Sequence, residues 1–497
     1  MVKYITIVIV CLLSNLIEIY SKTIEVCPTC PIRTLQDASK NAVPGDTILL
    51  RAGVYTTYNY IANLQGIPNA WITITSAANE EVVFRGQSTA IQFSDPAYLR
   101  IERLVFEAQT ANGLNIDDGG TYETPAHHIV IENCEWRNIN ATGNNDLLKL
   151  SGVDSFLVRK CIFRNGSPGG SGIDMVGCHF GIIENCRFEN QGSNSIQSKG
   201  GSSNIIIQKN LFVNGGLRTL NIGGSTGLQF FRPQGINYEA SKIYVYSNIF
   251  VGSQAPIVFV GAVDCEVVNN TIYKPTKWAI RILQETTEPN FLKCSNNSFI
   301  NNIVYIDNSA ASPTINIGTN TLPETFTFSN NLWFNKDNMN WAGPNLPASE
   351  TNGIRNVDPL VTENSEYGVS ISKSSPVAGR GKEVLNPTED YFGNLFNSPR
   401  SIGAIEINPK TVNNVAKSIV AQFSLYPNPV SDYLEIHFPE YPVNHNSLKI
   451  YNVLGECVTS SYVPSNEKHM FIDVKDLPPG IYFVCFNYFI EKIIIQK

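Results

Sequence analysis

Four stretches of the sequence repeat one pattern at nearly equal spacing, and this repeat constrains the fold more than any other feature. Each stretch alternates apolar and polar residues and turns at or beside a glycine; the stretches are 148–152, 173–177, 196–200 and 220–224. Their first residues are 25, 23 and 24 positions apart. A period of roughly 20–50 residues is typical of stacked repeat proteins, and the alternation predicts strands with one buried face. Equivalent residues would then lie about 4.8 Å apart in continuous columns.

A second ladder of strands has the same period. Its apolar strands lie at 129–131, 156–158, 182–183, 205–207, 244–245 and 266–267. Each leads to a cysteine or an asparagine and, two positions on, to a large apolar residue; the pairs are Cys134/Trp136, Cys161/Phe163, Cys186/Phe188, Asn210/Phe212, Asn248/Phe250 and Asn270/Ile272. We expect the cysteines to be buried, stacked thiols. Asparagine at a fixed turn is suited to bonding the backbones of neighbouring coils.

The two ladders together predict an all-β fold, a right-handed parallel β-helix. They resemble the parallel β-helix of pectate lyases, polygalacturonases and chondroitinase B over roughly residues 30–405. Residues 34–55 contain a short amphipathic pattern, a Pro-Gly-Asp turn and a strand pattern. They resemble the N-terminal cap that seals the open end of such stacks, and terminal repeats need a cap. Residues 357–406 resemble the closing coil of secreted β-helix proteins.

The C-terminal segment has a different character. Short apolar strands separated by Pro/Gly turns, at 425–430, 450–455 and 477–484, predict a small β-sandwich. The segment resembles the C-terminal sorting domain of type IX secretion in Bacteroidetes. The resemblance implies export across the outer membrane by the type IX machinery, followed by release or surface attachment. We therefore divide the chain into a signal peptide (1–21), a capped β-helix (22–406), a linker (407–420) and a sorting domain (421–497).

The N-terminus also predicts export. Lys3 precedes an apolar run at 5–13, and Ser21 is a small residue suited to a position before a cleavage point. No other segment is long and apolar enough for a membrane-spanning helix, so we expect a secreted or surface-held mature protein. In such a protein the Cys27-Pro-Thr-Cys30 motif predicts a local disulfide in preference to a metal site, because no second ligand pair follows at zinc-like spacing.

Composition narrows the range of partners. Charged residues make up only 16% of the chain and glycines number 36, which suits turn-rich β structure. The net charge of −7 argues against nucleic acid as a partner. It is compatible with an acidic glycan, because a local basic site can lie on an acidic protein. We expect a monomer.

The first ladder carries an outward polar row that is the candidate site. Lys149, Asp174, Gln197 and Asn221 occupy equivalent positions, and Lys199 lies two residues along its own strand. Exposed polar residues are the ordinary state of an outward face. Here, however, opposite charges lie one coil apart, amides suited to sugar hydroxyls lie beside them, and glycines flank the row, which predicts close approach of a ligand. An extended polysaccharide fits such a face.

The row suggests β-elimination from an acidic polysaccharide. Such a reaction needs a base for the proton alpha to a carboxyl group and a cation for the developing charge. Residues 195–199 and 219–222 resemble the catalytic coils of chondroitinase-B and alginate-lyase-like enzymes, which carry a lysine base at the place of Lys199. Their catalytic arginine would fall near Gly223, so Arg218 or Arg232 must supply that charge here.

An insertion of about 14 residues within 223–241 follows the row directly, and we expect it to take part in function. The catalytic candidates are therefore Lys199, Arg218 and Asp174. The substrate-binding candidates are Lys149, Gln197, Asn221, Arg232 and Tyr238.

Two alternatives to elimination stay open. Glycoside hydrolysis needs two carboxyl groups at roughly 5–9.5 Å; Asp174 would be one, with Asp117, Asp118, Asp146 or Glu239 as its partner. The protein could instead be a non-catalytic glycan-binding or surface protein. The sequence requires no metal, although the acidic pair Asp117-Asp118 would allow calcium. We expect His179, in the turn after the Asp174 strand, to make a structural hydrogen bond.

Overall fold

The computed structural model describes residues 21–497, except 69, 87, 122–123, 309, 311–312, 410–422, 439–446, 453–456, 464–467 and 487–488. The predicted signal peptide, apart from Ser21, and most of the predicted linker lie outside the described residues. Within the described residues, no helix is long and apolar enough to cross a membrane.

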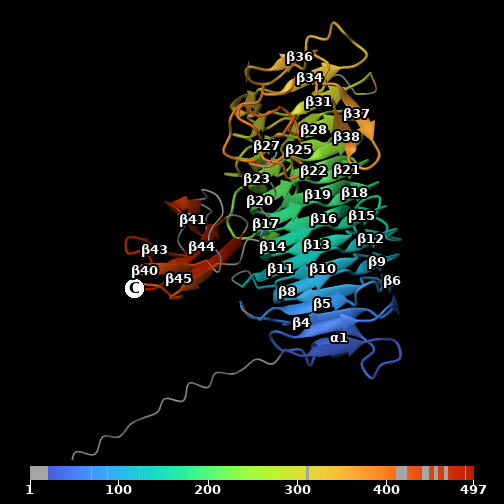
Figure 1. Cartoon of the computed structure of the whole chain (residues 1–497), viewed down its shortest axis with the longest axis vertical. Helices are drawn as coiled ribbons and strands as arrows, with labels where there is room; N and C mark the ends of the chain where they lie inside the picture. The colour runs from blue at the N-terminus through green and yellow to red at the C-terminus, as the bar shows by residue number, and fades with distance from the viewer. Residues whose placement is uncertain are drawn as a thin grey trace, which may run out of the picture.

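Three long parallel sheets wind around one core and stack into a column (Figure 1). Sheet A contains β1 (Thr23–Val26), β2 (Thr47–Leu50), β5 (Ile72–Ser76), β8 (Ala97–Glu102), β11 (Ala126–Glu132), β14 (Val153–Arg159), β17 (His179–Glu184), β20 (Ser202–Gln208), β23 (Ala240–Tyr246), β26 (Ala262–Val263), β27 (Glu266–Val268), β30 (Ser298–Ile300), β33 (Thr327–Ser329) and β35 (Glu350–Thr351). Sheet B contains β3 (Gly53–Tyr55), β6 (Val82–Arg85), β9 (Val105–Glu107), β12 (Glu135–Arg137), β15 (Ile162–Arg164), β18 (Arg187–Glu189), β21 (Leu211–Val213), β24 (Ile249–Val251), β28 (Thr271–Tyr273), β31 (Ile303–Ile306), β34 (Leu332–Asn335) and β36 (Ile354–Arg355). Sheet C contains β4 (Asn59–Ala62), β7 (Ile91–Ser94), β10 (Leu114–Asp117), β13 (Leu148–Ser151), β16 (Ser171–Val176), β19 (Asn194–Lys199), β22 (Arg218–Gly223), β25 (Ile257–Val260), β29 (Ile280–Leu283) and β32 (Ile315–Ile317).

The predicted cap closes the N-terminal end of the column. Helix α1 (Leu35–Ser39) begins after Thr34, whose side-chain oxygen accepts a hydrogen bond of 3.0 Å from the backbone N–H of Asp37. This bond satisfies one of the unpaired N–H groups at the helix start. Leu35 and Ala38 are buried and belong to the same core as the coils. The predicted disulfide between Cys27 and Cys30 is present.

Identical positions on successive coils stack inside the column. Aromatic rings form a continuous stack with neighbouring centroids 4.7–5.8 Å apart; its members are Phe84, Phe106, Trp136, Phe163, Phe188, Phe212 and Phe250. The thiols of Cys134, Cys161 and Cys186 are free and buried, as predicted. These stacks explain the second ladder of the sequence, because each coil must fill the same space in the core.

The segment after β36 differs from the prediction of a closing coil. It contains the antiparallel pair β37 (Val361–Asn364) and β38 (Gly368–Ile371) and runs back along the outside of sheet B. Val369, Val377 and Ile402 pack there against outward apolar residues of sheet B such as Leu211 and Ile249. Since the outward face of sheet B is apolar at this height, the returning segment buries it and adds no coil.

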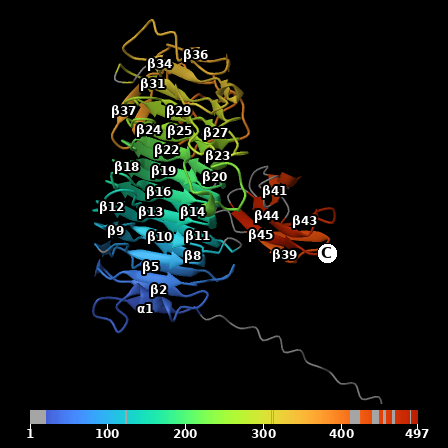
Figure 2. The same ribbon diagram turned by 180° about the vertical axis from the view of Figure 1, so that it is seen from behind.

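The C-terminal residues form a separate small β-sandwich, as predicted. One sheet contains β39 (Ser424–Tyr426), β40 (Tyr433–His437) and β43 (His469–Asp473); the other contains β41 (Ser447–Asn452), β42 (Cys457–Tyr462), β44 (Gly480–Phe486) and β45 (Phe489–Ile495). The two sheets share a core of their own. The sandwich lies beside sheet A in both views (Figures 1 and 2), where the Phe483 ring contacts Phe180 at a centroid distance of 4.4 Å.

Candidate functional site

The predicted polar row is one continuous column on the outward face of sheet C. In the parallel register Lys149 lies opposite Asp174, Asp174 opposite Gln197, and Gln197 opposite Asn221. Lys199 lies in the neighbouring outward column, opposite Val176. Parallel strands hold such positions about 4.8 Å apart, so the side chains of adjacent coils can contact one another directly.

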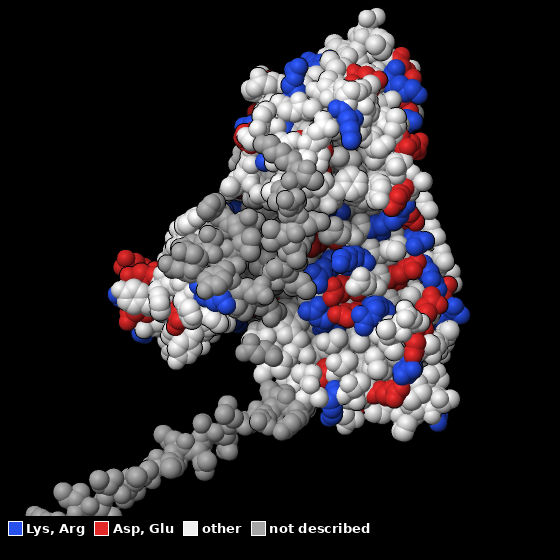
Figure 3. Space-filling view, in the orientation of Figure 1, with Lys and Arg blue, Asp and Glu red and all other residues white. Residues whose placement is uncertain are grey.

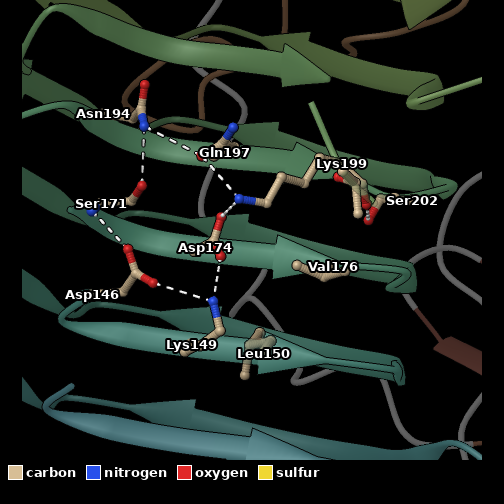
Figure 4. A network of polar contacts seen from close by, with 12 residues as sticks. Asp146, Lys149, Leu150, Ser171, Asp174, Val176, Asn194, Gln197, Lys199 and Ser202 are labelled. Atoms are coloured by element: carbon tan, nitrogen blue, oxygen red, sulfur yellow. Dashed lines mark hydrogen bonds and ion pairs between the residues drawn. The ribbon is translucent and has the colours of Figure 1, made fainter. Parts of the chain in front are cut away.

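Three charged side chains of this face form one cluster (Figure 4). Lys149 Nζ lies 2.7 Å from Asp174 Oδ2, and Lys199 Nζ lies 3.0 Å from Asp174 Oδ1. The Asp174 carboxylate is therefore held between ammonium groups from the coils on either side. Its side chain is only 1% exposed, whereas those of Lys149 and Lys199 are 26% and 13% exposed. The two lysines form the accessible part of the cluster, and Asp174 lies beneath them.

Asp146 is a fourth member of the cluster. It lies in the turn before β13, and its Oδ2 is 3.4 Å from Lys149 Nζ. Its Oδ1 accepts a hydrogen bond of 2.8 Å from the backbone N–H of Ser171. The sequence offered Asp146 only as one of several hydrolytic partners of Asp174, because the course of a turn cannot be read from strand periodicity. The structure joins Asp146 and Asp174 to the same ammonium group.

The pKa values of the Asp174 and Asp146 carboxyl groups shift in opposite directions. Burial alone would raise the pKa of Asp174, but the charges of Lys149 and Lys199 outweigh burial and lower it. Burial, with the negative charge of Asp174 added, raises the pKa of Asp146 to about 6. Burial disfavours the charged form of Lys149 as well, but Asp174 and Asp146 together raise the pKa of its ammonium group. The cluster therefore separates a strongly ionised carboxylate from one that titrates near neutrality.

The amide residues of the row support the cluster. Gln197 Oε1 lies 3.5 Å from Lys199 Nζ and accepts a bond of 3.4 Å from Asn194 Nδ2. Asn221, on the next coil, is 3% exposed, and its Oδ1 is buried without a hydrogen-bond partner among the described residues. An unpaired buried acceptor is uncommon in folded proteins, and here it lies directly beside the cluster.

The structure does not bring Arg218 to Lys199. Arg218 begins β22 and lies opposite Asn194, whereas Lys199 ends β19, five residues further along the strand. At about 3.3 Å per residue the separation is roughly 16 Å. The guanidinium of Arg218 is paired with Glu285 at 2.8 Å. The expectation that Arg218 supplies a cation beside Lys199 is therefore wrong in this structure.

Arg232 is also held elsewhere, by a strap formed by residues 224–239. Its backbone N–H donates to Gly200 O at 3.1 Å, and its side chain crosses the turns that follow β16 and β13 to reach the Asp118 carboxylate. Gly177 has φ +59°, and a Cβ there would lie 2.7 Å from Arg232 Cβ. We expected the flanking glycines to admit a ligand; at Gly177 and Gly152 they admit this arginine instead.

Other candidates also anchor the strap. The carboxylate of Glu239 is fully buried and accepts bonds from the backbone of Gly200 and Thr226 at 2.9 Å each, so it is not a partner for Asp174. His179 Nδ1 lies 2.8 Å from Asp154, and Nε2 lies 3.2 Å from the carbonyl oxygen of Arg232. Burial opposes a charged imidazole, but these acceptors raise the pKa of His179. This is the structural role that the sequence predicted.

The remaining predicted residues lie apart from the row. Tyr238, in the strap, lies on the side of sheet A, where burial raises its pKa and its hydroxyl bonds Ser203. Asp117 ends β10 and accepts bonds from Gln92 and Ser94 of the coil below, at 2.6 and 2.9 Å. Across the described ranges, no group of three His, Cys, Asp or Glu side chains is arranged to hold a metal ion.

Comparison with known proteins identifies the two parts of the chain. Residues 69–272 match the family described as right handed beta helix region, and residues 424–496 match the secretion system C-terminal sorting domain. No curated protein matches the chain. The protein is therefore a right-handed parallel β-helix protein. It carries a type IX secretion sorting domain, which directs export to the cell surface or the extracellular space.

Solved structures with a similar fold include several β-helix proteins. XylC in complex with xylose has a TM-score of 0.50 at 10% identity, covering 78% of this chain and 99% of that chain. Pectate lyase Pel9A has a TM-score of 0.47 at 14% identity, covering 78% and 97%. An alginate lyase from Paenibacillus sp. str. FPU-7 has a TM-score of 0.41 at 19% identity, covering 68% and 99%. At these identities the likeness concerns the fold alone.

Proposed function

We propose that this protein is a secreted carbohydrate-active enzyme that cleaves an extended acidic polysaccharide by β-elimination on the outward face of sheet C. The observation that carries the proposal is the cluster itself, in which Lys149 and Lys199 present two ammonium groups over one buried carboxylate. A flat parallel sheet is suited to an extended polymer, and paired cations are suited to a polymer that bears carboxylates.

Each member of the cluster has a separate role in this scheme. Lys199 reacts as the neutral amine: it takes up the proton alpha to the carboxyl group of a uronate unit and becomes the ammonium ion that pairs with Asp174. Lys149, the more exposed of the two lysines, neutralises that carboxyl group as negative charge develops. Lys149 thus supplies the positive charge that the sequence predicted at Arg218 or Arg232. The bond between the beta carbon and the glycosidic oxygen then breaks and the oxygen takes a proton from solvent water, which leaves an unsaturated sugar on one fragment and a new reducing end on the other.

Asp174 is a positioning residue in this scheme, because it is buried beneath the lysines and holds both of them. Gln197 contacts Lys199 and lies in the same outward column as Asp174. It would therefore orient both the base and a sugar hydroxyl. The role of Asp174 depends on contacts between adjacent coils, which the parallel register fixes, whereas Gln197 and Lys199 contact each other within one strand.

Hydrolysis is the second candidate, and one observation favours it. The pKa of Asp146 is raised to about 6 while that of Asp174 is lowered. Two carboxyl groups whose pKa values are pushed apart are the pattern of a glycosidase acid and its ionised partner. Both side chains are only 1% exposed, however. Hydrolysis would therefore need Lys149 to move aside, which elimination by Lys199 does not.

One assay separates these functions. The mature protein is incubated with polygalacturonate, alginate, chondroitin sulfate and a neutral xylan, and unsaturated uronate absorbance and reducing ends are followed together. Absorbance with new ends supports elimination, and new ends alone support hydrolysis. Retention on a polymer without either product supports binding alone and contradicts the proposal.

Variants then test the assigned base. Lys199→Ala should lower the elimination rate by about 100-fold or more. The matched control is Lys274→Ala, which removes a lysine from the turn after β28 of sheet B and should leave the rate unchanged. An unchanged rate in Lys199→Ala would show that the base lies elsewhere.

A further inference from the structure

The outward row continues beyond Asn221 to a second positively charged region. Asn221 lies opposite Val258 of β25, Val258 opposite Arg281 of β29, and Arg281 opposite Asn316 of β32. Arg281 is therefore in the same column as Asp174, four strands further along the stack. At about 4.8 Å per strand this is roughly 19 Å, a distance that an extended polymer can span along one straight face.

A tryptophan holds two cations in this region. Lys277 Nζ lies 4.1 Å and Arg281 Cζ lies 4.4 Å from the ring centroid of Trp278. The ring in turn packs against a small buried cluster formed by Ala255, Val258 and Val260. Arg281 Nε also donates a hydrogen bond of 2.9 Å to Asn316 Oδ1. The positions of both positive charges are therefore fixed by an indole that is itself fixed to the sheet.

These cations lack carboxylate partners. Among the described residues, no Asp or Glu lies within ion-pair distance of Arg281 or Lys277, and the nearby Glu285 is paired with Arg218 at 2.8 Å. Burial and the positive charge of Arg218 lower the pKa of Arg281, and the charge of Glu285 offsets them only in part. Holding a partly buried guanidinium without a carboxylate in direct contact is costly. Such an arrangement is expected where an anionic ligand supplies the missing charge.

The pairing of charges on sheet B differs from that around Trp278. Lys/Arg and Asp/Glu side chains are intermixed over the face in Figure 3, and those of sheet B pair with one another, as in Arg85–Glu107 and Arg164–Glu135. Solvent-exposed ion pairs of this kind present little net charge to an anion. Arg281, by contrast, lies on the column of the candidate site, and Lys277 lies just before β29 against the same Trp278 ring.

We propose that Lys277, Trp278 and Arg281 form an anion-binding subsite for a carboxylate- or sulfate-bearing sugar unit of the polymer bound along the row. The inference rests on the proposed function for the identity of the ligand as a polysaccharide. The subsite lies several sugar units from Lys199. It therefore selects polymers that are acidic along their length, and it favours long chains over short oligosaccharides.

Retention on immobilised polymers tests the subsite separately from turnover. Lys199→Ala is the parent, because its ligand is not consumed, and the matrices carry polygalacturonate, chondroitin sulfate or neutral xylan. Arg281→Gln and Lys277→Gln added to this parent should each weaken retention on an acidic polymer by about tenfold. Arg281→Lys should restore part of it. The two acidic matrices distinguish a carboxylate polymer from one that also carries sulfate.

The matched control is Lys274→Gln, which removes a lysine lying 5.0 Å from the Tyr273 ring on sheet B. It should not alter retention. Lys277 is exposed, so Lys277→Gln keeps the test valid if Arg281→Gln does not fold, as judged by thermal melting. Unchanged retention in a folded variant overturns the subsite, as does an equal loss on neutral xylan or failure of the parent to bind any acidic polymer.

The outcomes also separate this inference from the proposed function. If an acidic polymer is retained through Arg281 but never cleaved by the wild-type protein, the subsite stands and the enzymatic proposal fails. If the polymer is cleaved and Arg281→Gln changes neither retention nor KM, the enzymatic proposal stands and the subsite fails.

Discussion

Two columns of the same β-helix use the repeat in opposite ways. At the turn between sheets A and B, five successive coils place an asparagine at the same buried position; they are Asn210, Asn248, Asn270, Asn302 and Asn331. From Asn248 onward, each side-chain oxygen accepts from the backbone N–H of the preceding member at 2.8–2.9 Å. On the outward face of sheet C, by contrast, Lys149, Asp174, Gln197 and Asn221 all differ.

This contrast separates structural positions from functional ones in a repeat protein. The asparagine column meets the same demand on every coil, which is to satisfy backbone groups that water cannot reach. The outward row meets no such demand, so variation there carries information about a ligand. A column that repeats one residue type supports the stack, and we propose that the column whose polar residues differ from coil to coil binds the ligand.

The largest effect that would test this comparison is expected at Asp174. Asp174→Asn keeps the size of the side chain but leaves Lys149 and Lys199 without their shared carboxylate. We expect the free energy of unfolding to fall by about 3 kcal/mol, and cleavage or polymer retention to be lost with it. Chemical denaturation and the polysaccharide assay measure the two effects. Full activity in the folded variant would remove the cluster from the site.

A slightly smaller effect, on stability alone, is expected in the asparagine column. Asn270→Ala removes the acceptor of the Asn248 N–H and the donor to the carbonyl of Val245. The buried groups left unpaired should lower the free energy of unfolding by about 2 kcal/mol. Below the unfolding transition, KM and kcat should equal those of the wild type. A loss of activity without a loss of stability would break the distinction between the two columns.

The pH dependence of stability should come from the outward cluster and not from the asparagines. Because the folded state raises the pKa of Asp146 from 3.8 to about 6, it binds this proton more tightly than the unfolded chain does. The resulting stabilisation is present at about pH 4 and is lost as pH rises through about pH 6.

The matched variants make this test specific. Asp146→Asn should remove this fall in the free energy of unfolding, which urea denaturation measures between about pH 4 and pH 6. Asn270→Ala should keep the fall. Asp174 contributes in the opposite direction, because its lowered pKa gives stability that is lost only as pH falls below the usual range of a carboxyl group. An unchanged profile in Asp146→Asn would show that its proton is not linked to folding.

The smallest effect is expected on the outward face of sheet B, where charges repeat in an exposed ladder. Arg164 pairs with Glu135 at 3.2 Å and its side chain is 41% exposed. Arg164→Gln should change the free energy of unfolding by less than about 1 kcal/mol and leave polymer retention unaltered. A large loss of retention would mean that charge on either face, and not the varied row, binds the polymer.

Much of the fold could be predicted from the sequence because successive coils repeat one sequence pattern. The alternation in stretches such as 173–177 and the glycine turns that follow them fix which residues point outward. Lys149, Asp174 and Gln197 therefore align as expected. The sorting domain was predictable for another reason, since its turn motifs lie within a short contiguous segment.

The rest of the site depends on segments that lie outside the sequence repeat. Glu285, the partner of Arg218, lies in a loop 67 residues further along the chain, and no spacing rule connects them. The strap that holds Arg232 crosses turns of earlier coils. The importance of Arg281 depends on its contact with Trp278 and on having no carboxylate within ion-pair distance among the described residues, and both are tertiary facts.

The strap also limits how this protein can change length during evolution. Solenoids gain and lose whole coils, and each added coil lengthens the stack by about 4.8 Å. Arg232 and Asp118 belong to different coils and meet across the turns between them. A coil duplicated or deleted between these residues would separate the pair, whereas one added beyond β23 would not. The ion pair thus fixes the number of coils around the charge cluster and leaves the distal end free to vary.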